Sequence, residues 1–284
     1  MSARTGDPAA TGIAGAASAA RGFGQHVTAV ILTYDEAPNI ERVLRRLDWV
    51  ADIVVLDSGS RDGTCELAAA FPRVRCLQRT FDTQAAQWQH AIYATGIHTE
   101  WVLALDADYV LSEELVAELV ALQPDEAVSG YVTRFVYCIH GHRLRGTLYP
   151  PHATLFRPAR SRIEQDGHTQ RVRVAGTLRA LRGVILHDDR KSLQRWLWSQ
   201  DRYATLNAQR LCDPHAAPLR LQDRLRRLLV VMPWLMPCYS LFVAGGILDG
   251  WPGLYYALQR GVAELILSLK LLERRLQRRD TDRG

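Results

Sequence analysis

The sequence predicts an α/β protein built on a doubly wound, mostly parallel sheet. Between residues 27 and 105, short apolar runs rich in β-branched residues alternate with segments of helical periodicity. Several of these runs end in polar or acidic residues. A strand buried on both faces is a nearly continuous apolar run, and strands that alternate with helices indicate parallel crossover units.

Four strands and three helices are expected in this part of the chain. Strands are predicted at residues 27–33 (VTAVILT), 51–56 (ADIVVL), 74–78 and 101–105 (WVLAL). Helices are predicted at residues 39–47, directly after Pro38, and at residues 64–71 and 84–93. In open sheets of this kind ligands bind at the carboxyl ends of the strands, so we expect the site there.

The regular alternation ends near residue 130. Residues 131–186 are basic, with short strand-like stretches and turns, and a helix is expected at residues 192–211. From residue 254 a long helix carries one continuous apolar stripe of six residues: Leu258, Val262, Leu265, Leu269, Leu272 and Leu276. Either this stripe packs against the preceding domain or it forms a dimer seam.

Composition excludes several classes of protein. The 284 residues are 48% hydrophobic and 23% charged, which is ordinary globular usage. The net charge of +5 divides into −9 for residues 1–130 (9 Arg, no Lys, 18 Asp and Glu) and +14 for the remainder. This division is unlike a nucleic-acid binder, whose positive charge lies along one face, so we expect no nucleic-acid partner.

Two further compositional features concern cysteine and the N-terminus. The five cysteines are scattered without a C-x-x-C pair, which indicates neither a disulfide framework nor a zinc site. Residues 1–25 are rich in Ala, Gly, Ser and Thr and lack an apolar segment behind a basic one. We therefore expect a flexible tail there and no secretory signal.

Acidic residues after the predicted strands are the sharpest chemical signal. Asp106 and Asp108 follow the strand WVLAL directly, so both carboxylates can reach one cation as the chain leaves the sheet. Mg²⁺ is commonly held by one or two carboxylates together with substrate phosphates. The segment DSGSRDGT has no Gly-Lys-Ser/Thr ending, so it does not match a Walker loop. No G-x-G-x-x-G follows the first strand, which disfavours a dinucleotide cofactor.

Four segments together resemble a known family. VTAVILTYDEAPNI, VVLDSGSRDGT, FDTQAAQWQHAI and WVLALDAD are similar, in order and spacing, to inverting family 2 glycosyltransferases with the GT-A fold. The nearer resemblance is to bacterial lipopolysaccharide-core and exopolysaccharide enzymes. It implies a nucleotide-diphosphate-sugar donor, above all a UDP-sugar, and a divalent metal, Mg²⁺ or Mn²⁺. The resemblance covers roughly residues 27–280. Together with the composition of the chain, it leads us to expect a tail (1–25), a GT-A domain (26–190) and a helical, membrane-associating region (191–284).

The resemblance also implies roles for individual residues. Its nucleotide-sugar site comprises Thr33, Tyr34, Glu36, Asp57 (which would hold the base), Gln87, Asp106 and Arg190. Its metal site comprises Asp106, Asp108 and His187. The family's general base corresponds here to Asp166, with Glu164 in reserve, and His168 would position sugar or acceptor. Two positions depart from the family: Trp88 replaces a basic residue, and Gln170 replaces a Glu.

Residues 228–248 form an uncharged run of 21 residues, LLVVMPWLMPCYSLFVAGGIL. A helix of that length can cross a hydrocarbon core of about 30 Å, but Pro233, Pro237 and Gly245-Gly246 interrupt it. Basic residues flank it on both sides: Arg220, Arg224, Arg226 and Arg227 before it, and Lys270, Arg274, Arg275, Arg278 and Arg279 after it. We therefore expect residues 228–279 to lie on the membrane surface or re-enter it. A single span, a buried helix and an oligomer contact are the alternatives.

The sequence thus predicts transfer of a sugar, with inversion, to a lipid-linked or lipopolysaccharide acceptor at the cytoplasmic face of the inner membrane. A polyprenyl-phosphate glycosyltransferase is an alternative within the same chemistry. A sugar-phosphate nucleotidyltransferase belongs to a different class and should show a Gly-rich, Arg-containing loop where this chain has TYDEAPN. A catalytically idle membrane-bound binding module is the third possibility.

Overall fold

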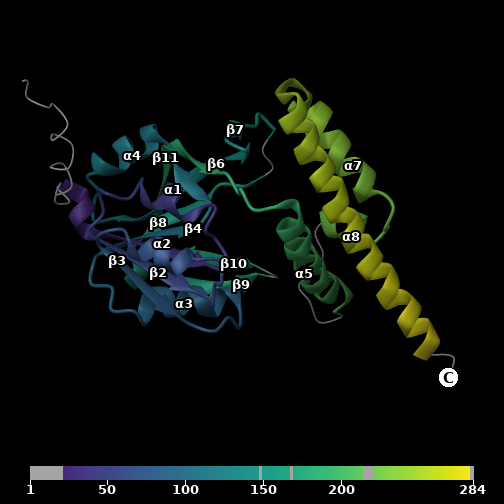
Figure 1. Cartoon of the computed structure of the whole chain (residues 1–284), viewed down its shortest axis with the longest axis horizontal. Helices are drawn as coiled ribbons and strands as arrows, with labels where there is room; N and C mark the ends of the chain where they lie inside the picture. Colours follow the sequence, from purple (N-terminus) through teal and green to yellow (C-terminus); the bar gives the residue numbers. More distant parts are fainter. Residues whose placement is uncertain (1–21, 147–148, 167–168, 214–220, 282–284) are drawn as a thin grey trace, which may run out of the picture.

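The computed structural model describes residues 22–146, 149–166, 169–213 and 221–281. It has an α/β body, formed by the chain up to residue 187, and an assembly of helices beside it (Figure 1). Residues 1–21, most of the predicted tail, and His168 lie outside the described residues.

The first half of the central sheet is parallel, as predicted. Its strands are β1 (Val27–Thr33), β2 (Asp52–Asp57), β3 (Val74–Gln78) and β4 (Trp101–Asp106), in the order β3-β2-β1-β4. Each begins and ends within one residue of its predicted bounds. The register pairs Thr33 with Asp57 and Leu32 with Asp106, so the carboxyl ends of β1, β2 and β4 lie level at one edge.

The second half makes the sheet mixed, so the prediction of a mostly parallel sheet is wrong beyond β4. The order continues β4-β8-β6-β11-β5, with β5 (Tyr109–Leu111), β6 (Val128–Ile139), β8 (His152–Phe156) and β11 (Thr177–His187). Only β6 and β11 pair in parallel among these neighbours; β4–β8, β8–β6 and β11–β5 are antiparallel. Only two residues separate β4 from β5, yet β5 pairs with β11 and not with β4. The short β7 (His142–Arg143) folds back on the end of β6.

Helices cover both faces of the sheet. A 3-10 turn, η1 (Gly22–His26), precedes β1, and the helices are α1 (Ile40–Leu44), α2 (Thr64–Ala69), α3 (Gln84–Tyr93) and α4 (Glu113–Val120). Alternate residues of β1 enter different cores: Ala29 and Ile31 pack in the larger cluster, Val30 in the cluster with Trp88 of α3. After the 3-10 turn η2 (Pro158–Arg160), the hairpin β9 (Ser161–Asp166) and β10 (Thr169–Val174) packs on α3, where the backbone N–H of Ala85 donates to Gln165 Oε1 (3.0 Å).

The C-terminal helices are α5 (Leu193–Cys212), α6 (Leu221–Arg226), α7 (Met232–Cys238) and α8 (Trp251–Thr281). Both α5 and α7 lie along α8 (Figure 1), and a small core of five buried residues joins α5 to α8: Ala204, Ala208, Leu211, Leu267 and Leu271. The predicted stripe from Leu258 to Leu276 faces away from this core and is exposed. It therefore does not pack on the catalytic body, because α5 and α7 occupy other faces of α8.

The uncharged run does not form one helix. It is divided into α7, a π-helical turn η3 (Tyr239–Val243) and a 3-10 turn η4 (Gly246–Asp249). Gly245, at φ +80°, reverses the chain in a left-handed conformation that other residues rarely adopt. Within the described chain, no helix has both the length and the apolarity needed to cross a bilayer.

Candidate active site

Four chain segments meet at the carboxyl edge of the sheet. The predicted strand ends placed three of them there, the residues after β1, after β2 and after β4, and the family resemblance implied part of the fourth through His187 and Arg190. The fourth, residues 187–191, arrives because the last residues of β11 pair antiparallel with β5, which places His187 opposite Tyr109. The backbone N–H of Asp188 donates to the carbonyl of Asp108 (3.1 Å), which extends this pairing into the acidic segment.

The loop after β2 is organised around Asp57. This fully buried carboxylate accepts from Thr33 Oγ1 (2.8 Å), from Ser60 Oγ, and from the backbone N–H groups of Gly59 (2.9 Å) and Ser60 (2.8 Å). Burial opposes ionisation, but these hydrogen bonds outweigh it and lower the pKa of Asp57. Asp57 and Thr33 thus hold the adjacent loops together, and a contact of Asp57 with a base stays a prediction.

Asp106 and Asp108 form an acidic pair at the end of β4, with His187 beside it. His187 Nε2 lies 3.1 Å from Asp108 Oδ2. Burial raises the pKa of Asp106 to about 6, and the charge of Asp108 acts in the same direction. Burial also opposes ionisation of Asp108, but the charge of His187 and its hydrogen bond lower that pKa to about 2. The pKa of His187 is raised, because Asp108 outweighs the effect of burial.

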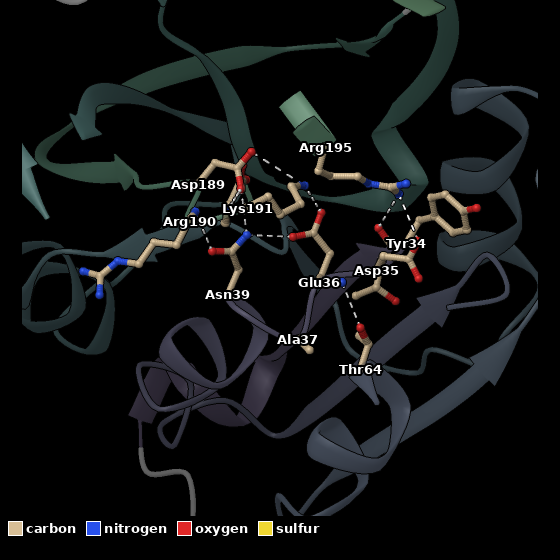
Figure 2. A network of polar contacts seen from close by, with 12 residues as sticks. Tyr34, Asp35, Glu36, Ala37, Asn39, Thr64, Asp189, Arg190, Lys191 and Arg195 are labelled. Atoms are coloured by element: carbon tan, nitrogen blue, oxygen red, sulfur yellow. Dashed lines mark hydrogen bonds and ion pairs between the residues drawn. The ribbon is translucent and has the colours of Figure 1, made fainter. Parts of the chain in front are cut away.

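A second acidic group, Glu36, is joined to the end of the β11 segment by Lys191 (Figure 2). Lys191 Nζ lies 2.6 Å from Glu36 Oε1 and 3.7 Å from Asp189 Oδ2. Asn39 Nδ2 donates to Glu36 (2.8 Å) and to Asp189 (3.0 Å), so one amide holds both carboxylates. Burial would lower the pKa of Lys191, but Glu36, Asp108 and Asp189 raise it, which keeps this lysine charged.

The pattern of strand ends did not single out Lys191 or Asn39. Lys191 directly follows the expected Arg190, and Asn39 closes the segment TYDEAPN, so both are neighbours of residues that the sequence did single out. Only the pairing of β11 with β5 brings these two motifs together across the sheet edge.

The start of α5 adds a rim of aromatic and cationic groups beside Tyr34 (Figure 2). The Arg195 guanidinium lies over the rings of Tyr34 (4.7 Å) and Trp198 (4.1 Å) and pairs with Asp35 (3.2 Å). Tyr34 is 37% and Trp198 41% exposed, so both rings present a face to solvent. Exposed aromatic faces beside a cation can stack on a base or a sugar ring. This rim was not predicted.

The remaining predicted residues have varied positions. Gln87 is buried and bonds to Ser58 Oγ (3.0 Å) and to Arg79, so it connects α3 to the β2 loop. Arg190 extends away from Glu36 and Lys191 (Figure 2) and pairs with Asp188 instead. Glu164 is exposed and pairs with Arg173 across the β9–β10 hairpin (3.1 Å). Asp166 ends β9, and its side chain lies outside the described residues.

The donor set fits a divalent metal in part. Among the described residues, no three acidic, histidine or cysteine side chains are arranged as a complete metal site. Asp106, Asp108 and His187 nevertheless supply carboxylate and imidazole donors, and His187 Nδ1 is buried without a hydrogen-bond partner in the described chain. Mg²⁺ and Mn²⁺ accept such donors and fill their remaining positions with water and phosphate oxygens.

Taken with this fold, the acidic strand ends define an α/β enzyme whose site suits a phosphate-bearing substrate and a cation. The family model described as "Glycosyl transferase family 2" matches residues 28–188. The chain belongs to this family and is a glycosyltransferase. The match disfavours the nucleotidyltransferase alternative.

Similar proteins include a curated relative and solved structures. The lipopolysaccharide core biosynthesis glycosyltransferase LpsC of Rhizobium meliloti (strain 1021) is 27% identical over 203 residues, which cover 68% of this chain and 74% of LpsC. Residues 1–349 of S. aureus TarS, in complex with UDP-GlcNAc, are 13% identical, with 89% of this chain and 92% of that one covered and a TM-score of 0.46. Glucosyl-3-phosphoglycerate synthase from Mycobacterium tuberculosis, in complex with Mn²⁺, UDP and glucosyl-3-phosphoglycerate, is 21% identical, covers 40% of this chain and 45% of its own, and has a TM-score of 0.31.

Proposed function

We propose that this glycosyltransferase transfers a sugar, with inversion, from a UDP-sugar to a lipid-linked or lipopolysaccharide acceptor at the cytoplasmic face of the inner membrane. The observation that carries the proposal is the acidic centre where β1, β4 and β11 meet. There Glu36, Asp106 and Asp108 face the cations Lys191 and His187 across an edge that Tyr34 and the α5 rim border.

The donor's diphosphate belongs beside this acidic centre. Asp106, Asp108 and His187 would hold the divalent metal, which supplies positive charge against the negative charge that grows on the leaving diphosphate. Lys191 lies close enough to Asp108 to influence its ionisation and can neutralise the same charge. Arg190 was expected in this role, but Lys191 extends into the centre while Arg190 extends out of it (Figure 2).

The nucleoside belongs between the β1 and β2 ends and α5. The exposed ring of Tyr34 lies there with Trp198, and Asp57 orients the neighbouring loop through Thr33 and Ser60. Glu36, buried next to Lys191, completes the boundary between the nucleoside and the diphosphate. Gln87 supports this loop from α3.

Inversion requires one displacement at the anomeric carbon. The acceptor oxygen forms the new bond as the carbon–oxygen bond to the diphosphate breaks, and the hydroxyl proton passes to a general base. We assign the base to Asp166, at the end of β9. Glu164 is the reserve, but its exposed pair with Arg173 already engages it.

The membrane proposal rests on the surface of the C-terminal helices. Trp234 (76% exposed) and Phe242 (66%) lie in the uncharged run of residues 228–248, and Trp251 (81%) lies just after it. The apolar stripe of α8, from Leu258 to Leu276, is exposed as well. Apolar and aromatic side chains of this kind enter the headgroup boundary of a bilayer, and basic neighbours attract anionic lipid. Arg226, expected among those neighbours, is instead paired with Glu264 inside the helical assembly. The name of the LpsC relative supports the lipopolysaccharide acceptor.

Donor binding and turnover test the proposal. A panel of nucleotide sugars is screened by thermal shift with Mn²⁺ or Mg²⁺, because a donor that binds the folded protein raises the melting temperature, and more so the further its concentration exceeds its dissociation constant. The preferred donor is then assayed with Asp106→Asn/Asp108→Asn, for which we expect at least about a hundredfold loss of turnover in a folded protein. Asp48→Asn, an exposed carboxylate on the same half of the chain, is the matched control. Retained turnover in the double variant would refute the assignment.

A further inference from the structure

A surface pocket of about 440 Å³ lies between α1, the start of β7 and the end of β11. Four arginines, one carboxylate and several small or apolar residues line it: Arg42, Arg45, Arg46, Arg190, Asp188, Gly141, Val110, Cys138 and Leu186. Pockets that hold small molecules measure about 300–1,000 Å³, so this one is large enough for a sugar phosphate.

Guanidinium groups outnumber carboxylates in this pocket. Asp188 is buried and accepts from Arg42 Nη1 (2.6 Å), from Arg190 Nε (3.0 Å) and Nη2 (2.9 Å), and from the backbone N–H of Gly141 (3.0 Å). One carboxylate therefore compensates two guanidinium groups, and these bonds use only two of the five donors of Arg190. Arg42 Nε is buried without a partner among the described residues.

The other two arginines are held loosely. Arg45 meets Glu41 at 3.3 Å and Arg46 meets Glu113 at 3.2 Å, with glutamate side chains 42% and 80% exposed. Exposed pairs of this kind contribute little, so both arginines can turn to a bound anion at small cost. With these glutamates counted, the lining still carries a net positive charge.

The backbone also makes room for the arginines. Gly141 has φ +84°, and a Cβ at this position would lie 3.0 Å from Arg190 Nη2. Any side chain there would crowd Arg190 and strain the turn. Glycine thus permits Arg190 to lie along the pocket, away from the donor centre, in the orientation that Figure 2 shows.

We propose that this pocket is a second anion site that binds a phosphate group, separate from the donor's diphosphate. Phosphate has the charge and the oxygen geometry that converging guanidinium groups bind in bidentate fashion. The pocket and the acidic centre are adjacent along the chain. Asp188, which lines the pocket, directly follows His187, and its backbone N–H donates to the carbonyl of Asp108. The site goes beyond the proposed function, because it binds phosphate whether or not a UDP-sugar is the donor.

Isothermal titration of the full chain, at low ionic strength and with EDTA, tests the site with inorganic phosphate and with glucose 6-phosphate. The wild type should bind at least one of them saturably. Arg45→Gln/Arg46→Gln should weaken that binding at least about tenfold, while Arg182→Gln, which changes an exposed arginine in the middle of β11 that does not line the pocket, leaves it unchanged. Tighter binding of glucose 6-phosphate would assign the pocket to a sugar-borne phosphate, and equal binding to the phosphate group alone.

UDP binding, measured with Mn²⁺ on the same variants, separates the two sites. We expect UDP affinity to be unaffected by Arg45→Gln/Arg46→Gln and phosphate to bind equally well with UDP present. Absence of saturable phosphate binding in the wild type, an equal loss in Arg182→Gln, or competition between UDP and phosphate would overturn the second site. Failure to bind UDP alone would count against the proposed donor and leave the phosphate result standing.

Discussion

Asp57 offers a prediction whose size follows from its contacts. Asp57→Ala leaves two backbone N–H groups, of Gly59 and Ser60, and two hydroxyls without their acceptor. An unpaired buried donor costs about 1–3 kcal/mol, and the partly exposed loop admits water to some of them. We therefore expect a loss of about 2–4 kcal/mol in the free energy of unfolding.

Asp57→Asn is the matched variant. Its Oδ1 can accept from the two backbone N–H groups, and its Nδ2 can donate to Thr33 and Ser60, whose hydroxyls accept as readily as they donate. All four contacts survive with only the charge removed, so we expect a loss below about 1.5 kcal/mol near pH 7. If Asp57 also binds the nucleobase of the donor, this variant should lose UDP affinity while it stays folded.

The pH dependence has a definite sign. The pKa of Asp57 is lower in the folded than in the unfolded chain, so its stabilisation is present above the unfolded value and lost as the pH falls through the folded value. The wild type should lose more stability than Asp57→Asn on acidification below about pH 4. Urea unfolding followed by tryptophan fluorescence measures both effects. A loss below about 0.5 kcal/mol for Asp57→Ala would refute the role of this carboxylate in organising the loop.

Two further predictions concern the C-terminal helices. Glu264→Ala leaves the partly buried Arg226, whose side chain is 21% exposed, with only a longer contact to Asp223. It should destabilise the assembly of helices α5 to α8 by about 2 kcal/mol, seen as faster hydrogen exchange in those helices but not in the sheet. Trp234→Ser/Trp251→Ser should reduce binding to vesicles containing anionic lipid at least about tenfold. The control Val120→Ser, which changes an exposed apolar residue on α4, should bind as the wild type does. Equal binding by the wild type and both variants would contradict the proposal that the C-terminal helices bind a membrane.

Local sequence patterns predicted much of the first half of the fold. β1 and α3 have the predicted bounds because each is determined by its own residues: a β-branched apolar run for β1, and a Thr83 cap with helical periodicity for α3. The mixed pairing from β8 to β11 could not be predicted this way, since strand order there depends on contacts between residues far apart in the chain.

The C-terminal helices show the same limit in another form. The apolar stripe of α8 was identified correctly as a stripe, but its periodicity is the same whether it faces a core or solvent. The structure leaves it exposed and buries Leu267 and Leu271 instead. Which face of a helix is covered depends on its neighbours, and those neighbours come from other parts of the chain.

The sequence by itself determined the family, the parallel strands and the acidic residues at their ends, because these depend on local order and residue type. Only the tertiary structure decided how the site is completed. Antiparallel pairing of β11 with β5 brings Lys191 to Glu36 and His187 to Asp108, and it turns Arg190 toward Arg42 and away from the donor centre. Those contacts join residues about 80 to 155 positions apart, a separation at which spacing along the chain no longer carries information about proximity.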